Sequence, residues 1–410
     1  MIRKVLIIGF VWPEPKSSAA GTRILQLVDL FKSYKFEVVF VSTASKTNNT
    51  FDLDSIGVSN FNIRLNHHSF DTFLKEMAPD MVVFDRYLTE EQFGWRVAEH
   101  CPNALRILDT EDLHFLRKAR QQAYKDNVDF IDEYLFSENA KRELASILRC
   151  DLSLIISEVE MRLLKEKFKV DEGKLFYLPF LLSFISKDKI NDLPSFEDRA
   201  HFMTIGTFLH EPNYQSVLNL KKNIWPLIRK KLPKAELHIY GAHISAKVEQ
   251  LHKENEGFLI KGFAEEASKT MQKYKICLAP LPFGAGLKGK LFDAMENGTP
   301  CVMSSIAAEG VFGTMESNGF ITDNPKDFVA QAVALYEDET LWKHSQQNGF
   351  SVINSRFQKK NFETIFFETL QFIFKNLKQH RQTHFLGEIL QYHTLKATKY
   401  MSKWIEEKNK

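Results

Sequence analysis

The sequence predicts an α/β protein of two Rossmann-like domains facing each other across a cleft, with further helices at the C-terminus. Its 410 residues exceed the usual size of one domain. Short apolar runs alternate with amphipathic segments of helical length, the pattern of parallel sheets covered by helices. A polar stretch at 186–200 separates the runs into two series. Each series is long enough to form a sheet of its own.

The first series predicts a buried parallel sheet. Its runs are apolar on both faces, as expected for strands covered by helices on each side. Amphipathic segments at 22–34 and 158–168 predict helices between them. The expected strands are 5–10, 37–43, 81–86, 104–110, 152–157 and 175–180.

The second series predicts another sheet of the same kind, followed by helices from about residue 326 onward. We expect an N-terminal domain at 1–190, completed by C-terminal helices at 381–410, and a second domain at 191–380. The expected strands are 202–207, 236–242, 258–263, 276–283, 300–306 and 319–323.

Composition excludes several classes of function. Lys and Arg number 54 against 52 Asp and Glu, so no overall field favours nucleic acid as a partner. No Cys or His spacing matches a zinc site, and the cysteines are typical of buried thiols in a reducing compartment. No run reaches the length of a membrane span. We therefore expect a cytoplasmic protein. The four cysteines are Cys101, Cys150, Cys277 and Cys301.

The segment at 279–300 carries the strongest chemical signal. Gly284, Gly286 and Gly289 let backbone N–H groups approach a ligand, and a helix expected from Lys288 presents its N-terminus to an anion. Lys288 and Lys290 add two cations in that first turn, where the helix dipole alone favours carboxylates. A diphosphate satisfies both features. Asp293, one turn further, is placed to accept hydrogen bonds from ribose hydroxyls.

Two other interpretations of this segment stay open. Residues 284–289 also match G-x-G-x-x-G, and Glu309 lies twenty residues beyond Gly289, which suggests an NAD(P)-dependent oxidoreductase. That fingerprint normally opens its domain, however, whereas here several strands precede it. The second interpretation is a glycine turn with solvated lysines and no ligand.

Several motifs in order resemble a known family. The run P-L-P-F-G-A-G-L-K-G-K-L-F-D-A-M-E-N-G-T-P-C-V at 280–302 closely resembles the donor-site signature of retaining GT-B glycosyltransferases of the group 1, or family 4, type. The segments at 205–213 and 225–233 resemble that family's H-x-P-N and W-P-x-I motifs. The resemblance covers about 201–313 well, and 12–23 more weakly.

This resemblance implies transfer of a sugar from a nucleotide sugar to a glycan or lipid-linked acceptor, with retention of anomeric configuration. The nucleotide sugar is a co-substrate, so no cofactor and no metal are expected. The implied donor-binding residues are Gly284, Gly286, Lys288, Lys290, Asp293, His210 and Glu309. Gly21, Thr22 and Arg23 form the implied loop for the acceptor or a phosphate.

The sequence departs from the family at three places. Phe283 occupies the position of the first of a carboxylate pair, and His210 lies where many members have an Arg. The place of a catalytic-site His reads Glu111-Asp112-Leu-His114, so these three residues are the catalytic candidates. A structural alternative makes Asp112 the N-cap of the next helix. A nucleotide-sugar epimerase of the same fold and a non-catalytic partner subunit are the alternatives for function.

The C-terminal tail suggests a surface for a membrane. Residues 375–410 hold eight basic and three acidic side chains, with apolar residues spaced to share a helix face. A basic amphipathic helix can lie on an anionic bilayer, which here means peripheral contact with the inner membrane. Packing of the tail against the body of the protein is the alternative.

Overall fold

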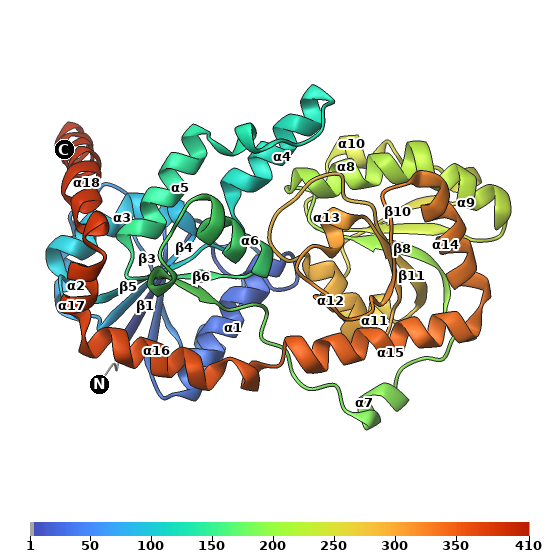
Figure 1. Cartoon of the computed structure of the whole chain (residues 1–410), viewed down its shortest axis with the longest axis horizontal. Helices are drawn as coiled ribbons and strands as arrows, with labels where there is room; N and C mark the ends of the chain where they lie inside the picture. The colour runs from blue at the N-terminus through green and yellow to red at the C-terminus, as the bar shows by residue number, and fades with distance from the viewer. Residues whose placement is uncertain (1–3, 410) are drawn as a thin grey trace.

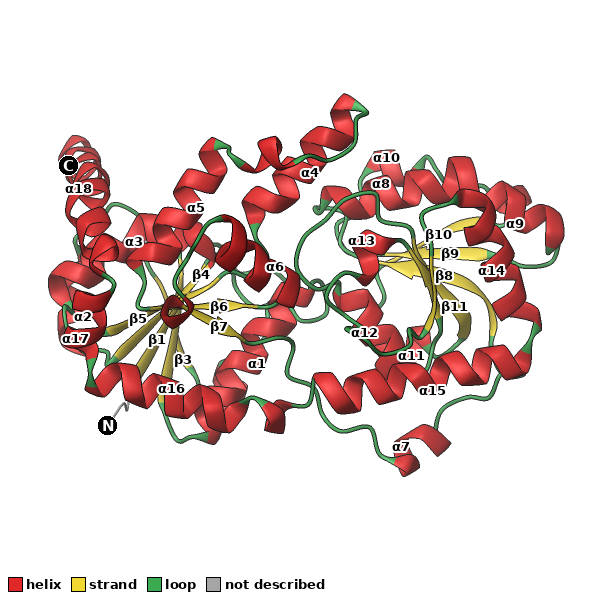
Figure 2. Cartoon of the chain, viewed as in Figure 1, coloured by secondary structure: helices red, strands yellow, loops and turns green. Residues whose placement is uncertain are grey.

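The computed structural model describes residues 4–409, which form two α/β domains side by side (Figure 1). Each domain is built on one parallel sheet with helices on both faces (Figure 2). The predicted fold class is therefore confirmed. No helix among residues 4–409 has both the length and the apolar character that a bilayer span requires.

The first sheet has seven strands in the order β3-β2-β1-β4-β5-β6-β7. Each expected strand of the first series is present, and β3 is an addition that the apolar pattern did not predict, because it is a polar strand at the sheet edge. The strands are β1 (Lys4–Gly9), β2 (Glu37–Ser42), β3 (Ser59–Asn62), β4 (Met81–Asp85), β5 (Leu105–Asp109), β6 (Leu152–Ile155) and β7 (Leu175–Tyr177).

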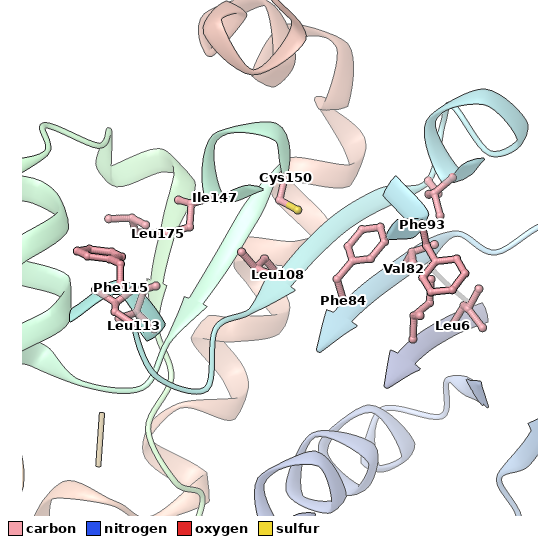
Figure 3. Close-up of a cluster of buried hydrophobic side chains, with 14 of the residues drawn as sticks. Leu6, Val82, Phe84, Phe93, Leu108, Leu113, Phe115, Ile147, Cys150 and Leu175 are labelled. Carbon is pink, nitrogen blue, oxygen red and sulfur yellow. The ribbon is translucent and has the colours of Figure 1, made fainter. Parts of the chain in front are cut away.

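Alternate residues of these strands enter two separate cores, because successive side chains point to opposite faces of a sheet. Leu6 and Val82 pack on one face with Phe93 and Phe115 from covering helices (Figure 3). The other face carries α1. The helices of this domain are α1 (Ala19–Ser33), α2 (Ser69–Met77), α3 (Arg86–His100), α4 (His114–Asp126), α5 (Glu138–Arg149) and α6 (Glu158–Arg162), with shorter turns η1 (Asp54–Ile56), η2 (Asp132–Leu135), η3 (Leu163–Lys167) and η4 (Glu172–Lys174).

The second sheet has six strands in the order β10-β9-β8-β11-β12-β13, all predicted from the apolar runs. Helices α12 and α15 cover one face, and α8, α9 and α14 cover the other. The strands are β8 (Ala200–Ile205), β9 (Leu237–Tyr240), β10 (Phe258–Gly262), β11 (Tyr274–Ala279), β12 (Cys301–Met303) and β13 (Gly319–Ile321).

Helical segments of different lengths connect and cover this second sheet. They are α7 (Lys187–Asn191), α8 (Glu211–Asn219), η5 (Leu220–Ile224), α9 (Trp225–Lys231), α10 (Ala246–Glu249), η6 (Glu254–Glu256), α11 (Ala267–Met271), α12 (Gly289–Glu296), α13 (Ser305–Ala308), α14 (Pro325–Glu337), α15 (Glu339–Arg356) and η7 (Lys359–Asn361).

The chain returns to the first domain earlier than expected. Helix α16 (Glu363–Lys375) packs Phe366 and Leu370 into the core that β1 and α1 share. The expected boundary at residue 381 is therefore too late, because α16 already belongs to the first domain. The phenylalanines of α16 predicted a helix, but they did not indicate which sheet the helix covers. Helices α17 (Leu377–Thr383) and α18 (Phe385–Lys408) follow on the same domain, and α18 contacts α3 and α5.

Candidate active site

The carboxyl ends of the two sheets face each other, and the candidate residues gather between them. Parallel α/β sheets place their ligands at this edge, in loops that follow the strands. From the first domain come the ends of β4 and β5 with the start of α4. From the second come the loop before α8 and the glycine segment before α12.

The side chain of Arg23 is bonded within the first domain. Its Nη2 lies 2.7 Å from Asp109, both side chains are almost fully buried, and its Nη1 donates to the carbonyl of Pro179. Arg23 is thus engaged within the first domain, and its expected contact with a phosphate or acceptor stays a prediction. Burial of the pair needs the guanidinium fork to satisfy Asp109, so Arg23 joins α1 to β5.

Glu111 lies just beyond β5 in a strained conformation, with φ at 59°. Its carboxylate is 2.6 Å from Arg86, and one of its oxygens is buried without a hydrogen-bond partner. Burial raises the pKa of Glu111, as do the carboxylates Asp85 and Asp109, against the opposing charge of Arg86. A non-glycine residue held at positive φ costs free energy that the surrounding fold must supply, and such strain gathers at functional sites.

Asp112 and His114 lie together at the start of α4. Asp112 is 2.7 Å from Arg117 and 3.3 Å from the Nε2 of His114. Burial opposes ionisation, but the charges of Arg117 and His114 lower the pKa of Asp112 below its usual value. Burial lowers the pKa of His114 to about 4, so its imidazole is neutral at neutral pH.

Asp112 does not cap α4, which corrects the structural alternative. The N-cap is Leu113, which offers no side-chain cap. Buried Glu143 of α5 instead accepts from the backbone N–H groups of His114 and Phe115, at 3.1 and 2.8 Å. A carboxylate from another helix satisfies the helix N-terminus, which leaves Asp112 to pair with Arg117.

His210 brings the second domain into this cluster. Burial lowers its pKa to about 4, and the charges of Arg117, Asp112 and Lys290 act on it as well. Groups that influence one another in this way lie close together. His210 of the second domain thus lies near Asp112 of the first, which itself contacts His114.

The two lysines lie at the first turn of α12, as predicted. The Nζ of Lys290 donates to Asn213 of α8 at 2.9 Å, and the Nζ of Lys288 donates to the carbonyl of Gly286 at 2.8 Å. Burial lowers the pKa of each lysine to about 8. No carboxylate of residues 4–409 forms an ion pair with either one. Lys288 is buried and Lys290 is half-buried, and the charges of Glu309 and Asp293 act on them without a direct ion pair. Two such cations whose Nζ atoms are hydrogen-bonded to neutral oxygens are suited to a bound anion.

Asp293 lies one turn further along α12, and its side chain is exposed. Desolvation by the surrounding protein raises its pKa to about 7, and the charge of Glu296 adds to this rise. The side chain can therefore donate as well as accept a hydrogen bond near neutral pH.

Contacts between the domains use several residues that we expected to hold the donor. The N–H of Gly286 donates to Glu160 of the first domain at 2.8 Å, so it is not free to bind a ligand in this arrangement. Glu309 is engaged by both Nη atoms of Arg120 at 2.7 Å, and Arg120 also donates to the carbonyl of Gly284. In this structure these residues join the two domains, and their expected role in binding the donor stays a prediction.

The loop before α1 meets the same region. A Cβ on Gly289 would lie 2.6 Å from the Cβ of Ala19, so the N-termini of α1 and α12 are in contact. Gly21 packs so closely on Glu14 that a Cβ would overlap its backbone, and Thr22 donates to the carbonyl of Pro15. This tight packing places the loop against α12.

Sequence reasoning missed three residues of the site. Asn213 lay inside a motif, but its bond to Lys290 joins positions distant in sequence. Glu143 and Glu160 are buried, but in the sequence they look like acidic residues on the exposed face of a helix. Among residues 4–409, no group of three or more His, Cys, Asp or Glu is arranged to hold a metal ion.

This geometry agrees with a family comparison. Residues 199–338 match the family model described as glycosyl transferases group 1, a range that includes His210, both lysines and Glu309. The second domain is therefore a group 1 glycosyltransferase domain. No curated protein matches the chain at a significant level.

Solved structures extend the likeness to both domains. Sucrose-phosphate synthase from Thermosynechococcus elongatus superposes with a TM-score of 0.68 at 14% identity, covering 91% of this chain and 99% of that one. S. aureus TarM in complex with UDP gives 0.67 at 10% identity, covering 91% and 100%. HepE from Anabaena, with UDP and glucose, gives 0.66 at 13% identity, covering 90% and 100%. These similarities show the GT-B fold.

Proposed function

We propose that this protein transfers a sugar from a nucleoside diphosphate sugar to an acceptor, with retention of anomeric configuration and without a metal ion. One observation carries the proposal: two lysines at the N-terminus of α12, Lys288 buried and Lys290 half-buried, form no ion pair with a carboxylate within residues 4–409. A diphosphate supplies the missing negative charge. The solved relatives that contain UDP share this fold and support the choice of ligand class.

In this proposal the second domain holds the donor. Lys290 binds the diphosphate and Lys288 assists it, while Asp293 hydrogen-bonds the ribose. Lysines and a helix N-terminus stabilise negative charge that develops on the leaving phosphate. His210 is neutral at neutral pH, so it donates one hydrogen bond to a phosphate or sugar oxygen without bringing a charge.

The first domain presents the acceptor to the donor. His114 is held by Asp112, which orients its ring, and Glu111 lies next to them on strained backbone. We assign these three residues to positioning and hydrogen-bonding the reacting hydroxyls. The leaving phosphate takes the proton of the acceptor hydroxyl, which is consistent with retention and needs no separate base.

A thermal-shift screen tests the donor site. Wild type, Lys290→Ala and the surface control Lys269→Ala are compared with UDP, GDP, ADP, CDP, dTDP and NAD. A ligand at a hundred times its Kd stabilises the folded protein by about 2.7 kcal/mol. We expect one nucleoside diphosphate to raise the Tm of wild type and of Lys269→Ala but not of Lys290→Ala. If NAD alone raised the Tm, or if none of the nucleotides raised it, the proposal would be contradicted.

We also propose that the acceptor is used at the cytoplasmic face of a membrane, with α18 as the contact surface. One face of α18 packs on the first domain through buried Leu395 and Ser402. Beside this packed face α18 exposes Tyr392, Tyr400 and Trp404, each more than 60% accessible. Lysines lie beside these rings, with the Nζ of Lys396 3.5 Å from the centre of the Tyr392 ring. Aromatic and basic residues on one helix face suit an anionic interface.

Flotation with anionic vesicles tests the membrane contact. Removing residues 381–410 is unsuitable, because Arg381 pairs with buried Asp151 at 2.8 Å and truncation would damage the first domain. The double variant Tyr400→Ser, Trp404→Ser is compared with Phe372→Ser, a change to an equally exposed aromatic of α16. We expect only the double variant to lose flotation. Equal flotation of all three proteins would exclude this role of α18.

A further inference from the structure

A cavity of about 470 Å³ lies between the domains, on the opposite face of the second sheet from α12. Its floor consists of the segments that follow β11, β12 and β13, and its roof is α4 with the segment after it. Among the described residues, its lining includes neither lysine of the donor site nor Asp293. The size is that of a site for a small molecule. The lining residues used below are Arg120, Tyr124, Asp129, Phe130, Ser305 and Asp323.

The walls of this cavity are held in place by side chains from both domains. Arg120 of the roof binds Glu309 and the carbonyl of Gly284, as described above. Tyr124 contacts the buried ring of Phe283, with the ring centres 5.3 Å apart. Phe283 is the residue that departs from the family's carboxylate. In this chain its ring supports the cavity wall.

The charges of the cavity exclude an anionic occupant. Among the described residues that line it, Arg120 is the cation, and both of its Nη atoms are already bonded to Glu309 and Gly284. Asp129 and Asp323 are exposed carboxylates on opposite walls. A phosphate or carboxylate here would meet two negative charges without a free cation, and desolvation would make this costly.

The remaining surface combines aromatic faces with hydrogen-bonding groups. Tyr124 and Phe130 are 43% and 38% accessible, although both are large apolar side chains. Asp323 accepts from the backbone N–H of Ser305 through one oxygen at 2.9 Å, which fixes the carboxylate and leaves the second oxygen for a ligand. A pyranose ring has the complementary chemistry, because its C–H face packs on an aromatic ring and its hydroxyls donate to carboxylates.

We infer that this cavity binds a neutral sugar ring of the acceptor, with Phe130 and Tyr124 against the ring face and Asp323 bonded to its hydroxyls. The inference rests on the proposed function, since it names the acceptor of that reaction as a saccharide. The occupant is bound by residues of both domains, so an acceptor in the cavity also favours the closed arrangement that Arg120 stabilises.

Saturation-transfer NMR with neutral methyl glycosides tests the cavity directly. The probes are the methyl glycosides of glucose, galactose, mannose and N-acetylglucosamine, each in both anomeric forms, with methyl glucuronide as the anionic comparison. The proteins are wild type, Phe130→Ala, Asp323→Asn and two matched controls. Phe136→Ala removes an exposed aromatic of the same segment outside the cavity, and Asp327→Asn neutralises an exposed carboxylate of α14.

We expect at least one neutral glycoside to bind wild type and both controls, and its affinity to fall about tenfold in Phe130→Ala and in Asp323→Asn. Methyl glucuronide should bind weakly or not at all. Absence of binding by every neutral glycoside, or binding that both cavity variants retain, would overturn the inference. Tighter binding of glucuronide than of the neutral probes would overturn it as well.

Failure of this inference and failure of the proposed function give different results. If no nucleotide binds at Lys290 but a glycoside still binds in the cavity, the cavity is a saccharide site and the transferase proposal is wrong. If nucleotide binding depends on Lys290 but no neutral glycoside binds, the transferase proposal stands and this assignment of the cavity is wrong.

Discussion

The two carboxyl edges that face each other differ in how their charges are paired. At the first edge Arg23 is joined to Asp109, and Arg86 to Glu111, in pairs 2.7 and 2.6 Å apart. At the second edge Lys288 and Lys290 are bonded to neutral oxygens alone. At the first edge the charges are paired directly within the domain, whereas at the second edge, among the described residues, the two lysines form no direct ion pair.

In the proposed function, this difference separates residues that stabilise the fold from residues that bind the donor. A buried ion pair that is complete needs nothing further, whereas a buried cation without an anion is maintained at a cost. Both edges hold charged side chains at the position where α/β proteins bind ligands, so position alone does not distinguish them. The two edges differ in whether their charged side chains form direct ion pairs.

The largest expected effect comes from breaking an ion pair of the first edge. Arg23→Ala leaves Asp109 buried without its partner, which should lower the free energy of unfolding by about 3–5 kcal/mol. Urea unfolding followed by circular dichroism measures the change. Arg64→Ala, at an exposed position, is the control and should change little. If Arg23→Ala kept wild-type stability but lost ligand binding, Arg23 would be a ligand-binding residue after all.

An intermediate effect is expected from titrating the lysines of the second edge. Burial lowers the pKa of Lys290 to about 8 in the free protein, and a bound diphosphate favours the protonated lysine and raises that pKa again. Binding therefore takes up a proton. The affinity should be highest below pH 8 and should fall by up to about tenfold per pH unit above it for each lysine that must be protonated.

Isothermal titration calorimetry across this range measures the pH dependence, with the nucleoside diphosphate that the thermal-shift screen identifies. Lys290→Ala should bind weakly and show a shallower pH profile, because only Lys288 then titrates. A flat profile in wild type from about pH 7 to about pH 9.5 would show that neither lysine takes up a proton on binding.

The smallest expected effect concerns the contact between the two edges. Arg120→Lys keeps the charge but loses the two-pronged contact with Glu309, which should weaken the domain contact by about 1 kcal/mol. Small-angle scattering should then show a larger radius of gyration than wild type. Arg142→Lys changes an Arg pair within the first domain and should leave the radius unchanged. Identical radii for all three proteins would mean that Arg120 is not needed for closure.

The sequence alone predicted most of the strands and the position of the glycine and lysine segment before α12. The strands of both sheets are continuous apolar runs, and the glycines and lysines of 284–290 lie close together in the chain. β3 was not predicted, because a polar strand at the edge of a sheet has no apolar run in its sequence. The family resemblance rested on the same local segments, and the family model confirmed it over 199–338.

Tertiary structure alone decided which charged residues are free. Arg23 and Asp109 are 86 positions apart, and Gly286 and Glu160 are 126 apart, so neither contact leaves a trace in local spacing. Apolar periodicity depends on residues that are close together in the chain, so it can be recognised in the sequence. The phenylalanines of α16 are an example. The partner of a buried charge depends on which strands and helices meet, and only the folded chain brings those together.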